Sequence, residues 1–431
     1  MQYFSLHNQS PIVDFKQATI NGQAPDKGLY FPTNLPALEL DFIKNINQYS
    51  NEEIAYSVIA PYVGNAIPSA ILQDIVTQTI NFSIPLVPIT QRISALEMFH
   101  GNTLAFKDIG ARFMSRCLGY FVKDQDVKVT VLVATSGDTG GAVADGFFDV
   151  EGVEVVILYP SGKVSTVQEK QLTTLGNNIK SIEVNGTFDD CQRMVKLAFM
   201  DEDLKSNLFL TSANSINVAR WLPQQFFYFL AYKQWNDKKN PPVIAIPSGN
   251  FGNICAGLLA LKTGLPIKHF LAACNANEVV PDFIRTGEYK AQQSIPTISN
   301  AMDVGDPSNF VRILHLFDND INKLKSVFSA VSISDEQTKS TLQKVYAEHQ
   351  YIMDPHGAVG YCALENYLQS HPLDAGIFAE TAHPVKFFDV VEPVISEKIK
   401  LPSSIEHLMN KEKVAIKMDA QFNDLKSYLL S

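Results

Sequence analysis

The sequence has few cysteines, and none of the spacings that bind metals or suggest disulfides. It contains five cysteines in 431 residues, with no Cys-x-x-Cys pair. Isolated thiols of this kind are typical of proteins in a reducing compartment. No His-Glu-x-x-His motif and no Cys/His cluster is present, so the sequence predicts no metal site. The cysteines are Cys117, Cys191, Cys255, Cys274 and Cys362.

Long apolar runs and an excess of basic charge are also missing. No uninterrupted apolar run reaches the roughly 20 residues that span a bilayer. Residues 1–5 lack the basic start and apolar continuation of a secretory signal. The net charge of −10 argues against nucleic acid or an anionic membrane as a partner. We therefore expect a cytoplasmic protein in which any anionic ligand meets a local positive site.

Two common nucleotide-binding loops are absent as well. Lys163 follows Gly162, but Val164 comes next, and Ile157 stands where a Walker A loop needs its first glycine. The segment 248–253 lacks the third glycine and the downstream acid of the dinucleotide fingerprint. Neither type of nucleotide site is predicted.

The sequence does contain a repeated order of apolar strand, small-residue turn and helix. Strands are predicted at residues 127–134, 153–159, 182–184, 208–210, 243–246, 269–274 and 376–380. This alternation predicts an α/β fold with doubly wound, mainly parallel sheets. A polar run at 236–242 is the best internal boundary. We predict a mostly helical lead-in at 1–95, one α/β lobe at 96–240 and a second at 241–431.

One lysine, Lys107, stands in an almost apolar setting. Apolar residues recur at helical spacing directly after it, so Lys107 is expected at the N-terminus of a buried helix. Burial and the helix dipole both disfavour a cation there and lower its pKa. A lysine that loses its proton can form a Schiff base. The alternative is an ordinary surface lysine. The apolar residues are Ile109, Phe113, Cys117, Leu118, Phe121 and Val122.

Two small-residue turns, 135–141 and 247–253, lie where predicted strands end and helices begin. Such turns meet at the carboxyl edge of a parallel sheet and offer N–H groups to an anion. Each could also be an ordinary turn with a helix cap. Together with a desolvated lysine and no metal motif, they fit a pyridoxal-phosphate enzyme. We interpret His100, His356 and His383 as structural residues.

Taken together, these motifs resemble those of a known family, the threonine synthases of bacteria and fungi. These belong to the tryptophan-synthase-β-like group of pyridoxal-phosphate enzymes, fold type II. The resemblance runs almost end to end and implies two interleaved lobes. Asn102 departs from it, because the family usually has proline there. The similar segments are 28–32, 100–108, 134–140, 212–217, 247–252, 299–304 and 381–384.

The resemblance implies a role for individual residues. Lys107 is similar to the lysine that forms the Schiff base with pyridoxal 5'-phosphate. Asp138 matches the contact to the cofactor's ring hydroxyl, and Thr381 the hydroxyl partner of its pyridine nitrogen. The residues that match the phosphate cradle are Ser248, Gly249, Asn250, Phe251, Gly252 and Asn253. The residues implied in substrate binding are Ser136, Gly137, Thr139, Asn217 and Arg220.

The implied reaction converts O-phospho-L-homoserine and water to L-threonine and phosphate, the last step of threonine biosynthesis. Two alternatives are a dehydratase or phospholyase of the same fold, and a catalytically silent paralogue. The identity of the product distinguishes a dehydratase or phospholyase from a threonine synthase. Failure to take up the cofactor would indicate a silent paralogue. The expected assembly is a monomer or homodimer.

Overall fold

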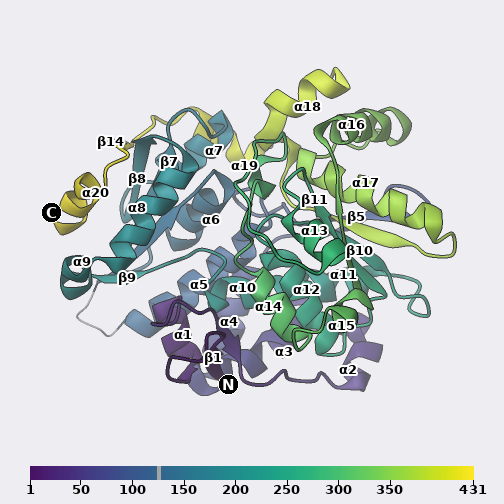
Figure 1. Cartoon of the computed structure of the whole chain (residues 1–431), viewed down its shortest axis with the longest axis horizontal. Helices are drawn as coiled ribbons and strands as arrows, with labels where there is room; N and C mark the ends of the chain where they lie inside the picture. Colours follow the sequence, from purple (N-terminus) through teal and green to yellow (C-terminus); the bar gives the residue numbers. More distant parts are fainter. Residues whose placement is uncertain (124–127) are drawn as a thin grey trace.

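The structure, a computed structural model, describes residues 1–123 and 128–431 and contains two large sheets (Figure 1). The first has five strands in the order β14-β8-β7-β6-β9, all paired in parallel. Their apolar, often β-branched residues suit strands covered on both faces. The strands are β6 (Val129–Ala134), β7 (Val153–Pro160), β8 (Ile179–Asn185), β9 (Phe209–Thr211) and β14 (Ile416–Asp419).

The second sheet has six strands in the order β12-β11-β10-β13-β5-β4, and only β4 runs antiparallel to its neighbour. The fold class predicted from sequence is therefore confirmed. Residue 127 of the first predicted strand lies outside the described residues. Sequence analysis missed β4, β5, β12 and β14. The strands are β4 (Leu86–Pro88), β5 (Ile93–Glu97), β10 (Val243–Pro247), β11 (His269–Cys274), β12 (Phe328–Ser332) and β13 (Gly376–Glu380).

Helices cover both sheets. The first sheet packs against α6 (Asp138–Phe147), α7 (Thr166–Thr173) and α8 (Phe188–Met200). The second packs against α12 (Gly252–Lys262), α13 (Val279–Thr286) and α17 (Pro355–Ser370). Further helices are α5 (Lys107–Val122), α9 (Glu202–Asn207), α10 (Val218–Trp221), α11 (Gln225–Gln234), α14 (Phe310–Leu316), α15 (Ile321–Lys325), α16 (Asp335–His349), α18 (Phe388–Ile395), α19 (Ser403–Met409) and α20 (Phe422–Leu430).

The N-terminal region adds helices and a small sheet below the two lobes, drawn in purple in Figure 1. Its antiparallel sheet, in the order β2-β1-β3, was not expected from the sequence. The apolar residues of this region join the largest core cluster, which reaches into both sheets. The elements are β1 (Gln2–Ser5), β2 (Val13–Asp14), β3 (Tyr30–Pro32), α1 (Phe15–Asn21), α2 (Leu40–Lys44), α3 (Asn51–Val63) and α4 (Ser69–Thr79).

The chain crosses between the two sheets more than once. β5 lies before α5 but pairs with β13, and β14 returns near the C-terminus to pair with β8. Figure 1 shows β14 and α20, in yellow, beside α8 of the first lobe. The limits at 95 and 240 stay predictions, because β5 spans residue 95 and the first sheet takes β14 from beyond residue 240. No helix among the described residues is long and apolar enough to cross a membrane.

Candidate active site

Lys107 begins α5 and lies beside the segment that follows β13. An isolated antiparallel bridge pairs Ala105 with Ala382. The N–H of Phe106 donates to the carbonyl of Thr381 at 2.9 Å. Two short segments far apart in sequence are therefore fixed next to each other, one carrying Lys107 and the other Thr381.

The loop before Lys107 is closed on itself by Asp108. The carboxylate of Asp108 accepts hydrogen bonds from the N–H and the hydroxyl of Thr103, the first at 2.9 Å. A Cβ on Gly101 would lie 2.3 Å from this carboxylate, so only glycine fits there. Leu104 adopts a left-handed conformation, with φ of 58°, which costs energy and recurs at functional sites. Burial raises the pKa of Asp108 to about 6.

Charged neighbours surround Lys107. Burial lowers the pKa of Lys107, Asp138 opposes this effect, and Lys386 and Arg220 lower the pKa further. A lowered pKa increases the fraction of free amine at neutral pH, as a Schiff-base lysine requires. The sequence prediction of a desolvated lysine at a helix start is therefore confirmed.

The turn after β6 presents Asp138 at the start of α6. Its carboxylate lies 2.7 Å from the Lys386 amine and accepts a hydrogen bond from Gln168 at 2.9 Å. Burial alone would raise the pKa of Asp138, but Lys386 and then Lys107 outweigh it and hold the pKa well below its usual range. Asp138 is therefore an anion in this site, an ionisation state that the sequence left open.

The rest of this turn is held by Thr135, a residue of the predicted turn 135–141 to which no separate role was assigned. The hydroxyl of Thr135 accepts hydrogen bonds from the N–H groups of Gly137 and Gly140, at 2.9 and 2.8 Å. Gly137 has φ of 138°, a conformation that other residues rarely adopt. Ser136 and Thr139 stay half-buried, and their hydroxyls have no hydrogen-bond partner among the described residues.

The predicted phosphate cradle follows β10, next to β13 in the sheet. A Cβ on Gly249 would lie 2.5 Å from the Cα of Met302, so the loop packs directly against another backbone. Phe251 is left-handed, with φ of 60°, and α12 begins at Gly252. The first N–H groups of a helix have no partner within it and can bind an anion.

Asn250 ties the cradle to two other loops. Its side-chain N–H donates to the Ser215 hydroxyl at 3.0 Å, and its oxygen accepts from the Ser308 N–H at 2.7 Å. Arg312, fully buried, donates to the carbonyls of Ser215 and Ile216 at 3.2 and 2.6 Å. Sequence analysis missed Arg312 because nothing in its local pattern separates it from a surface arginine.

Two cradle residues use their side chains for hydrogen bonds within the protein. The Ser248 hydroxyl donates to the Ile246 carbonyl at 2.8 Å. The Asn253 side chain accepts from the Tyr228 hydroxyl at 2.8 Å. Their predicted contacts with a cofactor stay predictions, and these bonds leave the backbone N–H groups as the main donors of the cradle.

The two weaker substrate-binding candidates are both buried. Asn217 caps α10, and its amide N–H donates to the Thr19 carbonyl at 2.9 Å, so its observed role is structural. Arg220 donates to the Ala213 carbonyl at 2.7 Å, while its Nε has no partner in the described part of the chain. Burial lowers the pKa of Arg220 to about 10. A contact of either residue with substrate stays a prediction.

A pair of buried carboxyl groups lies behind Thr381. Glu380, the last residue of β13, accepts from the Asp354 N–H at 2.6 Å. The other oxygen of Glu380 and one of Asp354 are buried without a partner among the described residues. Burial, followed by Asp354, raises the pKa of Glu380 well above its usual value. Glu380 therefore keeps its proton to a higher pH than an exposed glutamate does.

His356 extends this network to the cradle. Its Nδ1 lies 2.5 Å from an Asp354 oxygen, and its Nε2 accepts from the Ala301 N–H at 3.1 Å. Ala301 precedes Met302, the residue against which Gly249 packs. The interpretation of His356 as a structural residue agrees with these bonds.

A Glu380→Gln variant is expected to lose part of the pH dependence of stability. Native Glu380 keeps a proton that its unfolded form releases near pH 4.5, so unfolding free energy falls as pH rises above that value. One such proton changes stability by up to about 1.4 kcal/mol per pH unit. Glutamine does not titrate and can donate to Asp354. The unfolding free energy of the variant should therefore fall less steeply with rising pH than that of wild type.

The measurement is urea unfolding between pH 5 and 8, with the variant's slope subtracted from that of wild type. This subtraction removes the contribution of distant groups, so the difference reports Glu380 together with the groups that surround it, which are Glu97, Tyr351, Asp354, His356 and His383. The control is Glu406→Gln, an exposed position on α19 that should leave the slope unchanged. Equal slopes for wild type and Glu380→Gln would mean that Glu380 is ionised in the native state.

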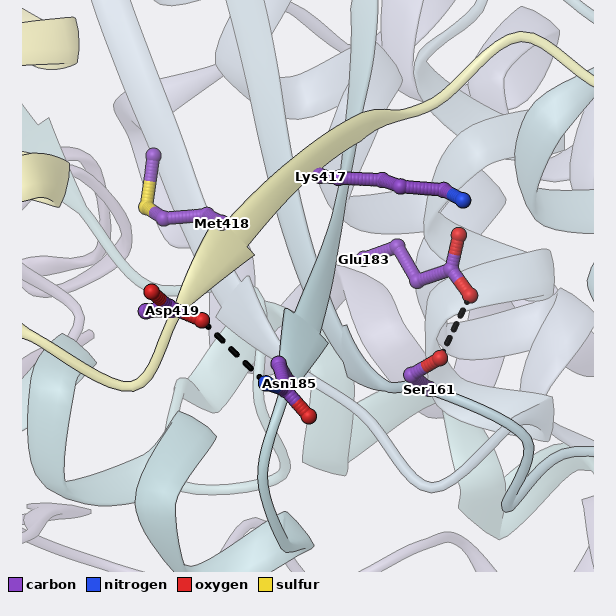
Figure 2. Close-up of a pocket in the computed structure, with 6 residues that line it drawn as sticks. All are labelled: Ser161, Glu183, Asn185, Lys417, Met418 and Asp419. Atoms are coloured by element: carbon purple, nitrogen blue, oxygen red, sulfur yellow. Dashed lines mark hydrogen bonds between the residues drawn. The ribbon is translucent and has the colours of Figure 1, made fainter.

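A separate surface pocket of about 390 Å³ lies at the carboxyl ends of β7, β8 and β14. Figure 2 shows that its polar side chains bond to each other: Ser161 to Glu183 at 2.6 Å, and Asn185 to Asp419 at 3.2 Å. The Lys417 amine extends toward Glu183 in the same view. The Asn185–Asp419 bond joins β14 to β8, and the two pairings leave few groups for a ligand.

The residues around Lys107 fit pyridoxal phosphate. In the described part of the chain, neither the Lys107 amine nor the Thr381 hydroxyl has a hydrogen-bond partner. The backbone approach at Gly249 leaves no room for a side chain, so this position can offer a ligand only its backbone N–H group. A free amine, a free hydroxyl and an anion cradle are the groups that this cofactor needs.

Comparison with known proteins gives the family context. The model of the family "Pyridoxal-phosphate dependent enzyme" matches residues 89–379. The models "Threonine synthase N terminus" and "Threonine synthase, C-terminal" match residues 2–80 and 357–429. These three models together account for most of the chain.

Individual relatives match over their full length. The threonine synthase of Serratia marcescens is 41% identical over 431 residues, which is 100% of this chain and 99% of the relative. The crystal structure of threonine synthase from Escherichia coli has a TM-score of 0.93 at 40% identity, covering 100% and 99% of the two chains. The PLP-bound threonine synthase from Brucella melitensis has a TM-score of 0.94 at 31% identity, again covering 100% and 99%.

Proposed function

Because the chain belongs to the threonine synthase family of pyridoxal-phosphate enzymes, we propose that the residues gathered around Lys107 carry out the reaction of that family. The reaction converts O-phospho-L-homoserine and water to L-threonine and phosphate. The observation that supports this assignment most directly is the bridge that holds Lys107 beside Thr381, next to the cradle after β10.

We assign four kinds of contact with the cofactor. Lys107 would bind it covalently, Asp138 would accept from its ring hydroxyl, and Thr381 would contact its pyridine nitrogen. A neutral hydroxyl at that nitrogen does not hold it protonated, so the ring is a tempered electron sink. The N–H groups of 249–253 bind its phosphate, helped by the dipole of α12. Asn250 orients this loop through Ser215.

The protein's own part of the chemistry is proton transfer and positioning. Bound pyridoxal phosphate supplies an electron sink for the negative charge that develops on the substrate carbons. The Lys107 amine removes the α proton and then a β proton, and phosphate leaves from the γ carbon. One proton returns to the γ carbon, which becomes the methyl group of threonine. Water then adds its hydroxyl at the β carbon and gives its other proton to the released phosphate, and Lys107 returns a proton to the α carbon.

Ser136, Gly137 and Thr139 are proposed to bind the substrate carboxylate or phosphate. Their support is the two unpartnered hydroxyls and the N-terminus of α6. Arg220 is proposed for the substrate phosphate, because its unpartnered Nε lies near Lys107 and guanidinium groups match phosphate. Asn217 is retained as a weaker proposal.

The test is amino-acid and phosphate analysis of the purified, cofactor-loaded protein incubated with O-phospho-L-homoserine. We expect threonine and phosphate in equal amounts. Phosphate with 2-oxobutyrate would replace this proposal by a lyase of the same fold. A protein that takes up no cofactor would indicate a silent paralogue.

We further propose a cytoplasmic location and a small-molecule substrate without nucleic-acid or membrane partners. All five cysteines are buried free thiols, which suits a reducing compartment. The assembly is proposed as a monomer or homodimer, and sedimentation equilibrium would decide between the two.

A further inference from the structure

A second lysine of the site, Lys386, has no part in the reaction described above. It lies in a 3-10 helix (Pro384–Phe387) just after Thr381, and its side chain is 0% exposed. Its amine lies 2.7 Å from the Asp138 carboxylate and donates to the Thr103 carbonyl at 2.8 Å. Lysine is almost never fully buried unless it is paired, so this arrangement is a specific feature of the site.

Lys386 connects three of the segments that form the site. Thr103 belongs to the loop before Lys107, Asp138 begins α6, and Lys386 itself follows Thr381. From α7, Gln168 donates to Asp138 at 2.9 Å. Both Lys386 and Gln168 reach the same carboxylate oxygen, Oδ1, and no described residue bonds Oδ2. One oxygen of Asp138 is therefore fixed, and the other is free for a ligand.

We propose that Lys386 is a positioning residue that keeps Asp138 an anion and aims its free oxygen at the ring hydroxyl of pyridoxal phosphate. This inference rests on the proposed function, since it needs Asp138 at that hydroxyl. A buried carboxyl without a cation would take up a proton and become a donor. With Lys386 in place it remains an acceptor, as the hydroxyl proton requires. Lys386 acts through Asp138 and not on the substrate.

The test compares wild type with Lys386→Met, Asp138→Asn, the double variant and Lys386→Arg. The measurements are the visible absorption band of the bound cofactor from pH 6 to 9, the dissociation constant from titration with pyridoxal 5'-phosphate, and kcat and KM. Lys386→Met should shift the band and weaken cofactor binding roughly 10- to 100-fold, as when an orienting partner is lost. Asp138→Asn should shift the same band.

Coupling is the decisive result. If Lys386 acts through Asp138, the double variant should be no worse than Asp138→Asn alone. Lys386→Arg keeps the charge, so its band should resemble wild type, and it supplies the test if Lys386→Met does not fold. A folded Lys386→Arg protein with the band of Asp138→Asn would overturn the proposal.

Two other roles of Lys386 predict different results. If Lys386 bound the substrate phosphate, Lys386→Met would raise KM, leave the band unchanged and add to the effect of Asp138→Asn. If Lys386 were purely structural, Lys386→Met would lower the unfolding midpoint, while the band and the cofactor affinity stayed at wild-type values. Either result would overturn the inference. A band that moves in Asp138→Asn but not in Lys386→Met overturns this inference alone. A band unmoved in Asp138→Asn overturns the proposed Asp138 contact as well.

Discussion

The Lys107→Ala protein is expected to form no measurable threonine from O-phospho-L-homoserine. The variant removes both the covalent attachment of the cofactor and the proposed acid–base group for proton transfer at the substrate carbons, so kcat should fall by roughly 10⁴-fold or more, the upper range for a lost acid–base group. The visible absorption band of the attached cofactor should disappear at the same time. The measurements are threonine formation and the absorption spectrum after incubation with pyridoxal phosphate.

The fold should survive this substitution. Lys107 is a desolvated cation, and Asp138 keeps its ion pair with Lys386 when Lys107 is removed. The unfolding midpoint should therefore stay at or above that of wild type. The matched control is Lys163→Ala, an exposed lysine that follows β7, which should retain full activity. Undiminished turnover by Lys107→Ala would exclude Lys107 as the catalytic lysine.

The Gly249→Ala protein is expected to bind pyridoxal phosphate poorly. The new Cβ would lie 2.5 Å from the Cα of Met302 and 3.2 Å from the carbonyl oxygen of Ala301. Both are backbone atoms, so the loop must move, and overpacking of this kind costs about 1–3 kcal/mol. Because the displaced loop is the phosphate cradle, we expect the dissociation constant of the cofactor to rise about 10- to 100-fold.

The control for this variant is another glycine-to-alanine change in a tight but tolerant place. Gly360 lies inside α17, and a Cβ there would lie 3.4 Å from the Pro247 side chain, an ordinary contact. Gly360→Ala should leave cofactor affinity unchanged. Titration of both variants with pyridoxal phosphate makes the comparison. Equal affinity of Gly249→Ala and wild type would mean that the 299–304 segment yields, or that the cofactor phosphate binds elsewhere.

Local pattern was sufficient for much of the fold and for the start of the site. Apolar runs bounded by small residues predicted the seven strands, because a strand covered on both faces needs such a run. The start of α16 also depends on adjacent residues, because Ser334 and Gln337 form a capping box there. Helical spacing after Lys107 predicted the first residue of α5. Each of these features depends on residues within a few positions of one another.

Other site features depend on contacts between distant parts of the chain. Lys386 and the carbonyl of Thr103 are 283 positions apart, and no nearby pattern marks that lysine as buried. Asn217 is a candidate ligand residue by sequence, but its side-chain amide donates to the carbonyl of Thr19. The return of β14 to the first sheet depends on pairing with β8, more than 200 positions earlier in the chain.

The sequence by itself determined seven of the strands in the two large sheets, the order of the turns and the lysine that starts α5, since hydrophobic periodicity and turn chemistry act locally. Only the tertiary structure decided which polar groups remain free. The side chains of Ser248, Asn217 and Asn253 form hydrogen bonds within the protein. The Lys107 amine and the Thr381 hydroxyl have no hydrogen-bond partner among the described residues. Most buried donors and acceptors are paired, and which partner each one has depends on how distant segments pack.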